Sequence, residues 1–351
     1  MISLITGITG QDGSLLAKFL LGKGYRVYGT YRRLSTPNFW RLQHLKILDK
    51  VRLIPADLLD DSSIIEAVRE SKPDEVYSLA AQSFVGASFE QPLASGQITG
   101  LGAVRVLEAI RQTYPRIRFY NAATSELFGT NGVYGVKQNE TTPFAPSSPY
   151  ATAKLYAYWM TKNYRESCDI FAVNGILFNH CGCLRGLEFV TRKVTNAAAR
   201  IKLGLQKYVE LGNLEAMRDW GWATEYVASM WLMMQQHQPD DYVIATGETH
   251  SVQELVELAF KCVELDWHEF VRTDDRLMRP VDVKCLCGDA SKAKRVLGWE
   301  AKVKFKELVQ LMVEADVDRW ERWQKGEHFP WDAPNYTEEA SIVSGMRNRG
   351  G

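Results

Sequence analysis

The sequence predicts an α/β fold, in which a doubly wound parallel sheet is accompanied by a smaller mixed α/β lobe. Short apolar runs of strand character alternate with helical stretches up to about residue 180, as in consecutive βαβ units. Beyond that point the order of strands and helices becomes mixed. The 351 residues, 46% of them hydrophobic, suffice for one large core and a second lobe. We expect a main domain over residues 1–180, a smaller lobe over 181–325 whose elements can interleave with it, and a tail over 326–351.

The first strand-turn-helix unit carries three glycines at its turn. Residues 1–5 form an apolar strand, Gly7, Gly10 and Gly13 follow with G-x-x-G-x-x-G spacing, and residues 14–24 form an amphipathic helix that ends in glycine. Glycine lets the backbone turn sharply and lets a pyrophosphate approach the free N–H groups at the helix N-terminus. The unit therefore predicts a dinucleotide site of the Rossmann type.

The second predicted strand, residues 25–30, indicates which dinucleotide is bound. Sites that prefer NAD usually end this strand with an acid that binds the ribose 2′-hydroxyl. Here the strand runs instead into Arg32 and Arg33. Two guanidinium groups suit a 2′-phosphate, so the sequence predicts NADP as the cofactor.

Three further predicted strands bring polar or small residues to the same edge of the sheet. Residues 51–58 include Asp57, which is placed to hydrogen-bond the adenine amine. Residues 75–83 end in small side chains, which would let a cofactor lie across the strand ends. Residues 117–123 deliver the Thr-Ser-Glu run at 124–126 to the same crevice.

Tyr150 and Lys154 lie one helical turn apart, on the same face of a predicted helix. The ammonium favours the phenolate, so we expect a lowered pKa for Tyr150 and a base that acts near neutral pH. Such a base takes the proton of an alcohol while a nicotinamide takes its hydride. Glu126 is a second base, placed to remove the acidic proton beside a newly made ketone. Oxidation, elimination and reduction in that order are the steps of a sugar-nucleotide dehydratase.

The remaining predicted elements form the smaller lobe, which would bind substrate. A helix-capping signature joins Ser251 to Glu254 at the start of one of them. The predicted helices are residues 191–204, 224–236 and 251–263, and the predicted strands are residues 207–212 and 242–246.

Composition excludes several classes of function. A formal net charge of zero argues against a general role at nucleic acids or membrane surfaces. No apolar run approaches the roughly 20 residues of a membrane-spanning helix. Because Met1 begins the first strand directly, we expect no signal peptide and a cytoplasmic protein.

The six cysteines include two C-x-C pairs, Cys181 with Cys183 and Cys285 with Cys287. These spacings differ from the C-x₂₋₄-C pattern of zinc sites. Alternating cysteines in a strand are usually packed as small apolar residues. We therefore expect no metal, and in a cytoplasmic protein no disulfides.

The longest motifs of the chain resemble those of the extended short-chain dehydrogenase/reductase group and, within it, the GDP-mannose 4,6-dehydratase family. The resemblance runs from residue 2 to about residue 323. Its most specific strings are ITGITGQDGS at residues 5–14, ATSELFG at 123–129 and SPYATAKLYAYW at 148–159.

This resemblance implies a reaction in three stages. Tyr150, held by Lys154, takes the proton from the sugar O4 as hydride moves from C4 to NADP, and Thr124 hydrogen-bonds O4. Glu126 then removes the C5 proton and returns a proton to the departing C6 hydroxyl. Hydride returns to C6, so GDP-mannose becomes GDP-4-keto-6-deoxymannose and NADP is regenerated in each turnover.

The resemblance also implies which residues contact each ligand, and that the subunits form a homodimer or homotetramer. The implied NADP contacts are Gly7, Thr9, Gly10, Gln11, Asp12, Gly13, Arg32, Arg33, Asp57, Leu58, Leu79, Ala80, Ala81, Ser83, Lys154, His180 and Arg185. The implied contacts of GDP-mannose are Ser83, Ser125, Asn179, Val190, Lys193, Gly212, Arg218 and Arg279.

The chain departs from the family pattern at two segments. After Asn179 and His180 the family usually carries Glu-Ser-Pro, whereas this chain carries Cys-Gly-Cys-Leu-Arg at 181–185. Residues 34–40, in a stretch that helps the family's subunits to pair, also differ from the commonest version. The first segment borders the cofactor and the substrate, so it bears on which sugar is bound.

Three alternatives stay open at this point. One is a 4-ketosugar reductase of the same fold, which would use Tyr150 and Lys154 but leave Glu126 idle. Another is a dehydratase of a different nucleotide sugar, such as a GDP-heptose or a CDP-hexose. The third is a non-catalytic NADP sensor or scaffold, which would have no use for the whole set of catalytic residues.

Overall fold

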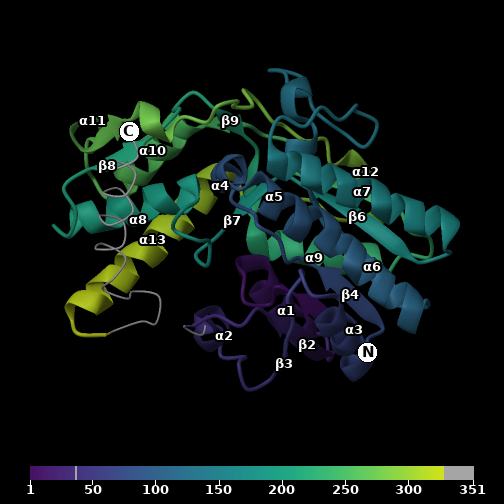
Figure 1. The fold of residues 1–351 in the computed structure, drawn as a ribbon. Coiled ribbons are helices and arrows are strands. Elements are labelled where there is room, and N and C mark those ends of the chain that lie inside the picture. Colours follow the sequence, from purple (N-terminus) through teal and green to yellow (C-terminus); the bar gives the residue numbers. More distant parts are fainter. Residues whose placement is uncertain (36–37, 328–351) are drawn as a thin grey trace.

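The computed structural model describes residues 1–35 and 38–327 (Figure 1). Its centre is a seven-stranded sheet with the order β11-β6-β5-β4-β1-β2-β3, in which every neighbouring pair is parallel. This confirms the predicted doubly wound sheet. Its strands are β1 (Ile2–Thr6), β2 (Arg26–Tyr31), β3 (Arg52–Pro55), β4 (Glu75–Ser78), β5 (Arg118–Thr124), β6 (Ala172–Leu177) and β11 (Asp241–Ile244).

Helices cover both faces of this sheet and bury a separate apolar cluster on each. On one face Leu16, Tyr226 and Met230 belong to a fully buried cluster, and on the other Leu107 and Phe119 belong to a second. Because both faces are covered, the strands read as nearly continuous apolar runs. The first face carries α1 (Gln11–Gly22), α9 (Ala223–Met234) and α12 (Ser291–Leu297), and the second carries α3 (Asp61–Ser71), α6 (Gly102–Thr113) and α7 (Pro149–Ser167).

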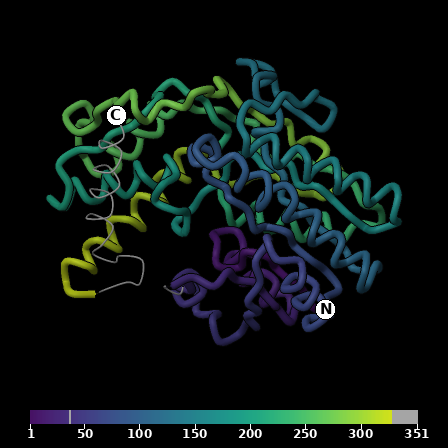
Figure 2. The backbone as a smooth tube through the Cα atoms, in the orientation of Figure 1, coloured from purple at the N-terminus to yellow at the C-terminus, as the bar shows by residue number. Residues whose placement is uncertain are grey.

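The strand order reverses between β1 and β4. The chain builds β1, β2 and β3 outward in one direction, then returns to place β4 on the other side of β1. In open α/β sheets, ligands bind in the crevice that opens beyond the carboxyl ends of the strands at such a reversal. The turn after β1 and the loop after β4 both lie at this point, which can be followed in the backbone trace (Figure 2).

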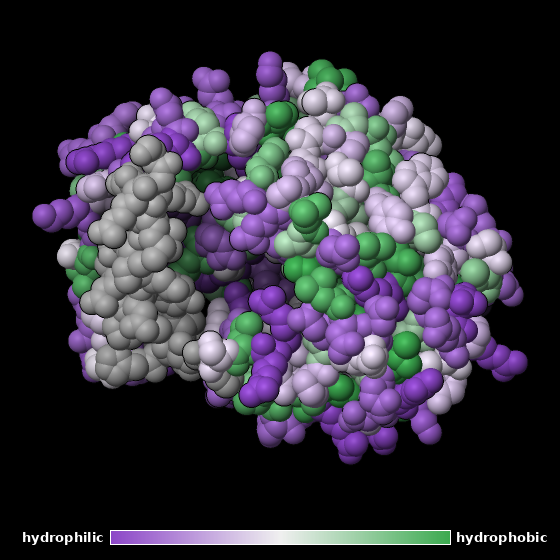
Figure 3. Space-filling view, in the orientation of Figure 1, coloured by the Kyte–Doolittle hydropathy of each residue, from purple (hydrophilic) through white to green (hydrophobic). Residues whose placement is uncertain are grey.

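A second lobe lies beside the sheet, at the left of Figure 1, and has its own core. Its main helices are α8 (Val190–Lys202), α10 (Val252–Cys262) and α13 (Phe305–Gln324), which pack on one another. The predicted capping box is confirmed. The Ser251 hydroxyl accepts from the backbone N–H of Glu254, and the Glu254 carboxylate accepts from the backbone N–H of Ser251. In the space-filling view the surface is hollowed between this lobe and the sheet domain (Figure 3).

The remaining elements are short. Paired strands are β7 (Asn179–Cys181) with β10 (Trp220–Trp222), β9 (Met217–Arg218) with β12 (His250–Ser251), and β8 (Val209–Leu211) with β13 (Val271–Thr273). Short helices are α2 (Trp40–His44), α4 (Val85–Glu90), α5 (Pro92–Ser95), η1 (Gly96–Leu101), η2 (Ser125–Leu127), η3 (Gly129–Asn131), α11 (Trp267–Phe270) and η4 (Asp275–Leu277). Within the two described ranges, no helix has both the length and the apolar character needed to cross a membrane.

Several sequence expectations need correction. The strand and helix expected at 242–246 and 224–236 belong to the main sheet and not to the smaller lobe, because β11 pairs with β6 and α9 packs on α1. The first helix begins at Gln11, three residues earlier than expected, because Gly10 already serves as its N-cap. Cys285 lies in no strand and forms only an isolated bridge with Met217. Almost all of the predicted tail lies outside the described residues.

Candidate active site

In the turn after β1, two of the glycines, Gly7 and Gly13, lie where a Cβ atom would not fit. Gly7 has a φ of +71°, and a Cβ on it would lie 2.9 Å from the Cα of Ala80 in the loop after β4. A Cβ on Gly13 would lie 2.4 Å from the carbonyl oxygen of Gly7. The Thr6 hydroxyl oxygen accepts from the backbone N–H groups of Leu79 at 3.0 Å and Ala80 at 3.1 Å, which fixes the two loops together. The resulting bare backbone beside the start of α1 fits a pyrophosphate.

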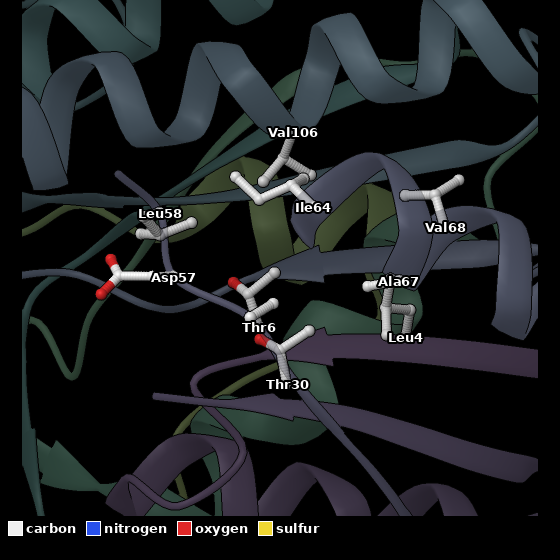
Figure 4. Close-up of a pocket in the computed structure, with 10 residues that line it drawn as sticks. Leu4, Thr6, Thr30, Asp57, Leu58, Ile64, Ala67, Val68 and Val106 are labelled. Atoms are coloured by element: carbon white, nitrogen blue, oxygen red, sulfur yellow. The ribbon is translucent and has the colours of Figure 1, made fainter. Parts of the chain in front are cut away.

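An adjoining recess lies between the ends of β1, β2 and β3 and the helices α3 and α6 (Figure 4). Thr6, Thr30 and Asp57 supply its polar side chains, and Leu58 and Val106 are among its apolar ones. Its volume is only about 10 Å³, far below that of a ligand pocket, so the recess itself has no room for a purine base. The predicted phosphate ligands Arg32 and Arg33 follow directly on β2 and are exposed at this same edge.

The four predicted catalytic side chains come from β5, η2 and the first turns of α7, and all are buried. Thr124 ends β5, and its hydroxyl oxygen accepts from the backbone of Glu126 at 3.3 Å. Pro149 opens α7, and Ser148 caps it by accepting from Ala151 at 3.1 Å. This cap sets the direction in which the first turn of α7 faces β5, and the side chain of Thr124 favours the ionised form of Tyr150 there.

The ionisation of Tyr150 differs from the sequence expectation. Burial raises the pKa of the phenol to about 12, and the charges of Glu126 and Asp12 add to this, while the hydrogen bond from Thr124 and the charge of Arg185 oppose it. Lys154 does not donate to the phenol; its Nζ donates to the carbonyl of Ala122 at 2.6 Å. Burial also lowers the pKa of Lys154 to about 8, against the charge of Asp12. The fold alone therefore does not supply a phenolate at neutral pH.

Asp12 and His180 link the glycine-rich turn to the chain beyond β6. Nε2 of His180 lies 2.9 Å from Oδ2 of Asp12, and its Nδ1 lies 2.8 Å from the carbonyl oxygen of Phe178. The imidazole stacks on Tyr226 with ring centroids 4.7 Å apart. Burial opposes ionisation of Asp12, but His180 and Arg185 hold its pKa well below its usual value. The carboxylate beside an anion-binding helix terminus thus has His180 and Arg185 as its partners.

The predicted cofactor residues converge on one edge of the sheet. They follow β1, β2, β3 and β4, and His180 and Arg185 follow β6 on the same side, while Lys154 reaches it from α7. Ser83, expected to contact both ligands, is exposed there, whereas Ser125 is only 1% exposed.

The predicted substrate residues of the smaller lobe form two groups. Arg218 and Arg279 share the carboxylate of Asp282, with N–O distances of 3.0 and 3.8 Å. Lys193 lies on α8, and burial lowers its pKa, opposed by Glu210 and Asp274. Val190 is the first residue of that same helix. The two groups offer three cationic side chains, which suit a diphosphate.

Two other predicted substrate positions show features that a ligand would use. The side-chain oxygen of Asn179 is buried without a hydrogen-bond partner, an arrangement that is rare unless a ligand completes it. A Cβ on Gly212 would lie 2.8 Å from the carbonyl oxygen of Leu277, so only glycine lets these two loops approach.

The comparisons with known proteins show the family of the chain. A family model described as GDP-mannose 4,6 dehydratase matches residues 4–312. The chain belongs to the GDP-mannose 4,6-dehydratase family. It is 51% identical over 327 residues to GDP-mannose 4,6 dehydratase 2 of Arabidopsis thaliana, covering 90% of this chain and 87% of that protein. It is 46% identical over 343 residues to GDP-mannose 4,6 dehydratase of Homo sapiens, covering 90% and 91%.

A solved structure supports the same fold over most of the chain. UDP-glucose 4-epimerase of Thermus thermophilus, in complex with NAD, matches with a TM-score of 0.79 and 26% identity. The match covers 90% of this chain and 99% of that one. The resemblance seen in the sequence motifs is confirmed.

This member of the GDP-mannose 4,6-dehydratase family carries cysteines where the common pattern has Glu-Ser-Pro. Burial raises the pKa of Cys181 to about 11, and it raises that of Cys183 to about 11 as well, so both are thiols at neutral pH. Across residues 1–35 and 38–327, no group of three or more His, Cys, Asp or Glu side chains is placed to hold a metal ion.

Sequence reasoning missed two arginines that fix segment 181–185. Arg41 of α2 donates to the carbonyls of Thr9 at 3.1 Å and Leu184 at 2.8 Å, joining that segment to the glycine-rich turn. Arg192 of α8 forms a buried ion pair with Asp316 of α13 at 2.7 Å. A charged residue on the apolar side of a predicted helix was a usable signal for Arg192, whereas no pattern marks Arg41.

Proposed function

We propose that this chain is a GDP-mannose 4,6-dehydratase, which converts GDP-mannose to GDP-4-keto-6-deoxymannose. The observation that carries the proposal is the convergence of Thr124, Glu126, Tyr150 and Lys154 in one buried cluster beside a glycine-rich turn. High identity to dehydratases of that name over 90% of the chain supports the same substrate. A carbon–oxygen lyase that recycles its cofactor needs both a redox base and an elimination base, and this pocket offers both.

Each catalytic side chain has a role that its position allows. Tyr150 would take the proton from O4 of the sugar, and Thr124 would hydrogen-bond O4 and steady the oxygen as its charge develops. Glu126 would remove the C5 proton and protonate the departing C6 hydroxyl. Lys154, held by the Ala122 carbonyl, would keep positive charge close to the site.

The cofactor that fits these residues is NADP. The bare backbone at Gly7 and Gly13 would accept a pyrophosphate, and Asp57, just after β3, would hydrogen-bond the adenine amine. Arg32 and Arg33 favour a 2′-phosphate over a bare hydroxyl. When bound, NADP would accept a hydride from C4 and return it to C6, so no net reductant is consumed. One structural neighbour is an epimerase bound to NAD, and another, RMD of Pseudomonas aeruginosa, is complexed with NADPH.

We also propose a homodimer or homotetramer in the cytoplasm. Large apolar side chains are exposed on neighbouring helices α5 and α7, where Leu93 is 84%, Tyr156 is 43% and Trp159 is 50% exposed. Exposed apolar patches of this kind mark protein–protein interfaces. A second copy of the chain packed on this face would cover them.

Incubation with GDP-mannose in the absence of added NADPH tests the proposal. Mass spectrometry should detect loss of one water from the nucleotide sugar, and Glu126→Gln should abolish it. Reduction of a supplied 4-ketosugar at the expense of NADPH would instead identify a reductase. Water loss from a GDP-heptose or CDP-hexose but not from GDP-mannose would move the assignment to another nucleotide sugar. Bound NADP with no turnover of any of these would identify a sensor.

A further inference from the structure

The loop after β4 is fixed at both of its ends by the hydroxyl of a buried threonine. At the start of the loop, Thr6 accepts from the backbone N–H groups of Leu79 and Ala80 at 3.0 and 3.1 Å. At the far end, Thr99 accepts from the backbone N–H of Gln82 at 3.1 Å and donates to the carbonyl of the same residue at 3.4 Å. Because Thr6 is 3% and Thr99 2% exposed, water competes little for these hydrogen bonds.

This loop carries predicted contacts of both ligands. Residues 79–81 are predicted to contact NADP, and Ser83, the neighbour of Gln82, is predicted to contact NADP and the sugar nucleotide. Thr99 is not among the predicted site residues. Its hydroxyl nevertheless holds the backbone directly before Ser83, at the point where the two ligands would meet.

Thr99 belongs to an irregular part of a long helical segment. It lies in η1, a π-helix that joins α5 to α6 without a break. Such π-helical turns are rare and are frequent at functional sites. The side chain of Gln82 adds two contacts, because its Oε1 accepts from the Ser95 hydroxyl at 3.4 Å and its Nε2 donates to the carbonyl of Phe84 at 3.0 Å. Gln82 is therefore held to this helical segment through both its backbone and its side chain.

The same π-helix packs on the catalytic helix α7. A Cβ on Gly100 would lie 3.2 Å from the carbonyl oxygen of Ala153 and 3.5 Å from its Cα, so glycine lets η1 approach α7 closely. Ala153 lies between Tyr150 and Lys154. The residue after Thr99 thus packs on the turn that carries the two predicted catalytic side chains, while Thr99 itself holds the ligand loop.

We propose that Thr99 is a positioning residue, whose hydroxyl fixes Gln82 and thereby sets the place of Ser83 between cofactor and substrate. Because η1 also packs on α7, the ligand loop is held in register with the catalytic turn. The contact of Ser83 with a sugar nucleotide rests on the proposed function. The hold of Thr99 on a cofactor-binding loop does not depend on which sugar is bound.

The test compares the NADPH affinity of full-length variants by calorimetry. Thr99→Val keeps the shape of the side chain but removes the hydroxyl, which leaves the backbone N–H of Gln82 without this acceptor. The affinity should fall by roughly three- to tenfold. Thr99→Ser keeps the hydroxyl and should bind NADPH nearly as the wild type does. Amide hydrogen exchange at Gln82, measured without ligand, should be faster in Thr99→Val than in the wild type or in Thr99→Ser.

A matched control separates positioning from a general loss of stability. Thr161 is also fully buried, and its hydroxyl donates to the carbonyl of Ala157 at 2.8 Å within α7. Thr161→Val therefore removes a buried hydroxyl by the same change of shape, but far from the loop after β4. It should lower the free energy of unfolding without changing the affinity for NADPH.

Kinetics with GDP-mannose distinguish this inference from the proposed function. Thr99→Val should raise KM and leave kcat nearly unchanged, because the catalytic side chains and the packing of Gly100 on α7 are left in place. Failure of the proposed function would appear as absent turnover of GDP-mannose in the wild type. The NADPH affinities would still decide the role of Thr99.

Two results would overturn the inference. Wild-type NADPH affinity in Thr99→Val would show that the hydroxyl does not position the loop. Equal losses in Thr99→Val and Thr99→Ser would show that the packing of the side chain matters and the hydroxyl does not. If Thr99→Val does not fold, Thr99→Ala takes its place, with the same loss of affinity expected and an unchanged affinity contradicting the inference.

Discussion

The Oδ2 atom of Asp12 lies 2.9 Å from Nε2 of His180, although 168 residues separate them. Nδ1 of the same imidazole faces the carbonyl oxygen of Phe178, so both ring nitrogens meet acceptors. The contact fastens the N-terminus of α1, where a pyrophosphate would bind, to the strand that carries the predicted substrate residue Asn179.

Asp12→Asn should destabilise the protein in a pH-dependent way. His180 and Arg185 lower the pKa of Asp12 against the effect of burial. A lowered pKa contributes stability that is present above the unfolded carboxyl pKa of about 3.9 and lost as pH falls below it. The variant should therefore lose about 1–2 kcal/mol at pH 7, and the difference from wild type should shrink in acid. Urea unfolding at several pH values measures it; a pH-independent difference would contradict this account.

Lys154 should also make stability rise with pH, but in an alkaline range. Burial lowers its pKa from 10.5 to about 8, so between these values the unfolded chain binds more protons than the folded one. The stability of the wild type should then rise with pH across this window, by about 3 kcal/mol in total. Lys154→Met lacks this gain, so its stability relative to wild type should fall by that amount from pH 8 to pH 10.5. Parallel curves for the two proteins would rule out a buried, partly neutralised lysine.

Glu126→Gln should separate oxidation from elimination. Without the C5 base, water loss from GDP-mannose should fall by roughly 10²–10⁴-fold. Tyr150 and Lys154 are left intact, so the absorbance of reduced nicotinamide should build up on the protein in a single turnover. Glu140→Gln serves as the control. Glu140 accepts from the backbone of Val243, a residue of β11, at 2.8 Å. Full activity in Glu126→Gln would remove Glu126 from the mechanism.

Gly13→Ala should weaken binding of the dinucleotide. The new Cβ would lie 2.4 Å from the carbonyl oxygen of Gly7, so the turn that cradles the pyrophosphate must shift. We expect at least about a tenfold loss of NADPH affinity, or about 1.4 kcal/mol, by calorimetry. Gly22→Ala in the same helix meets nothing within 4 Å and should bind as wild type does. Equal affinities in the two variants would mean that the turn does not form the cradle.

Arg192→Ala should be among the most destabilising single changes in the smaller lobe. It would leave the buried carboxylate of Asp316 with Arg319 as its remaining ion-pair partner and would free the carbonyls of Cys183 and Arg185. Leaving a buried charge wholly unpaired costs about 3–5 kcal/mol, and because Arg319 remains we expect a loss toward the lower end of that range. Chemical unfolding measures the loss. The control is Arg111→Ala, which removes an exposed ion pair with Glu108 and should have only a small effect. A small effect at Arg192 as well would show that water reaches the pair.

The parts of the fold that local sequence specifies were predictable. Glycine spacing after an apolar strand marked the turn of Gly7 and Gly13, and the Ser251 capping signature marked the start of α10. Tyr150 and Lys154 were found because helical spacing fixes their common face. These features depend on residues within a few positions of one another.

The features that sequence reasoning missed depend on distant contacts. The strand of Tyr242 joins the main sheet because it pairs with β6, which lies some seventy residues earlier. Arg41 bonds a carbonyl 143 residues away. The pKa of Tyr150 was misjudged because burial, and not the neighbouring Lys154, is its largest influence. Burial is set by the whole fold and leaves no mark on a four-residue motif.

The central claim is that one pocket oxidises C4, eliminates water across C5 and C6, and returns the same hydride to C6. GDP-mannose labelled with deuterium at C4, incubated with the purified protein without added NADPH, tests this most directly. The account predicts a product that has lost one water and carries the deuterium at C6. A dehydrated product without that deuterium, or deuterium released into an added nicotinamide pool, would contradict it.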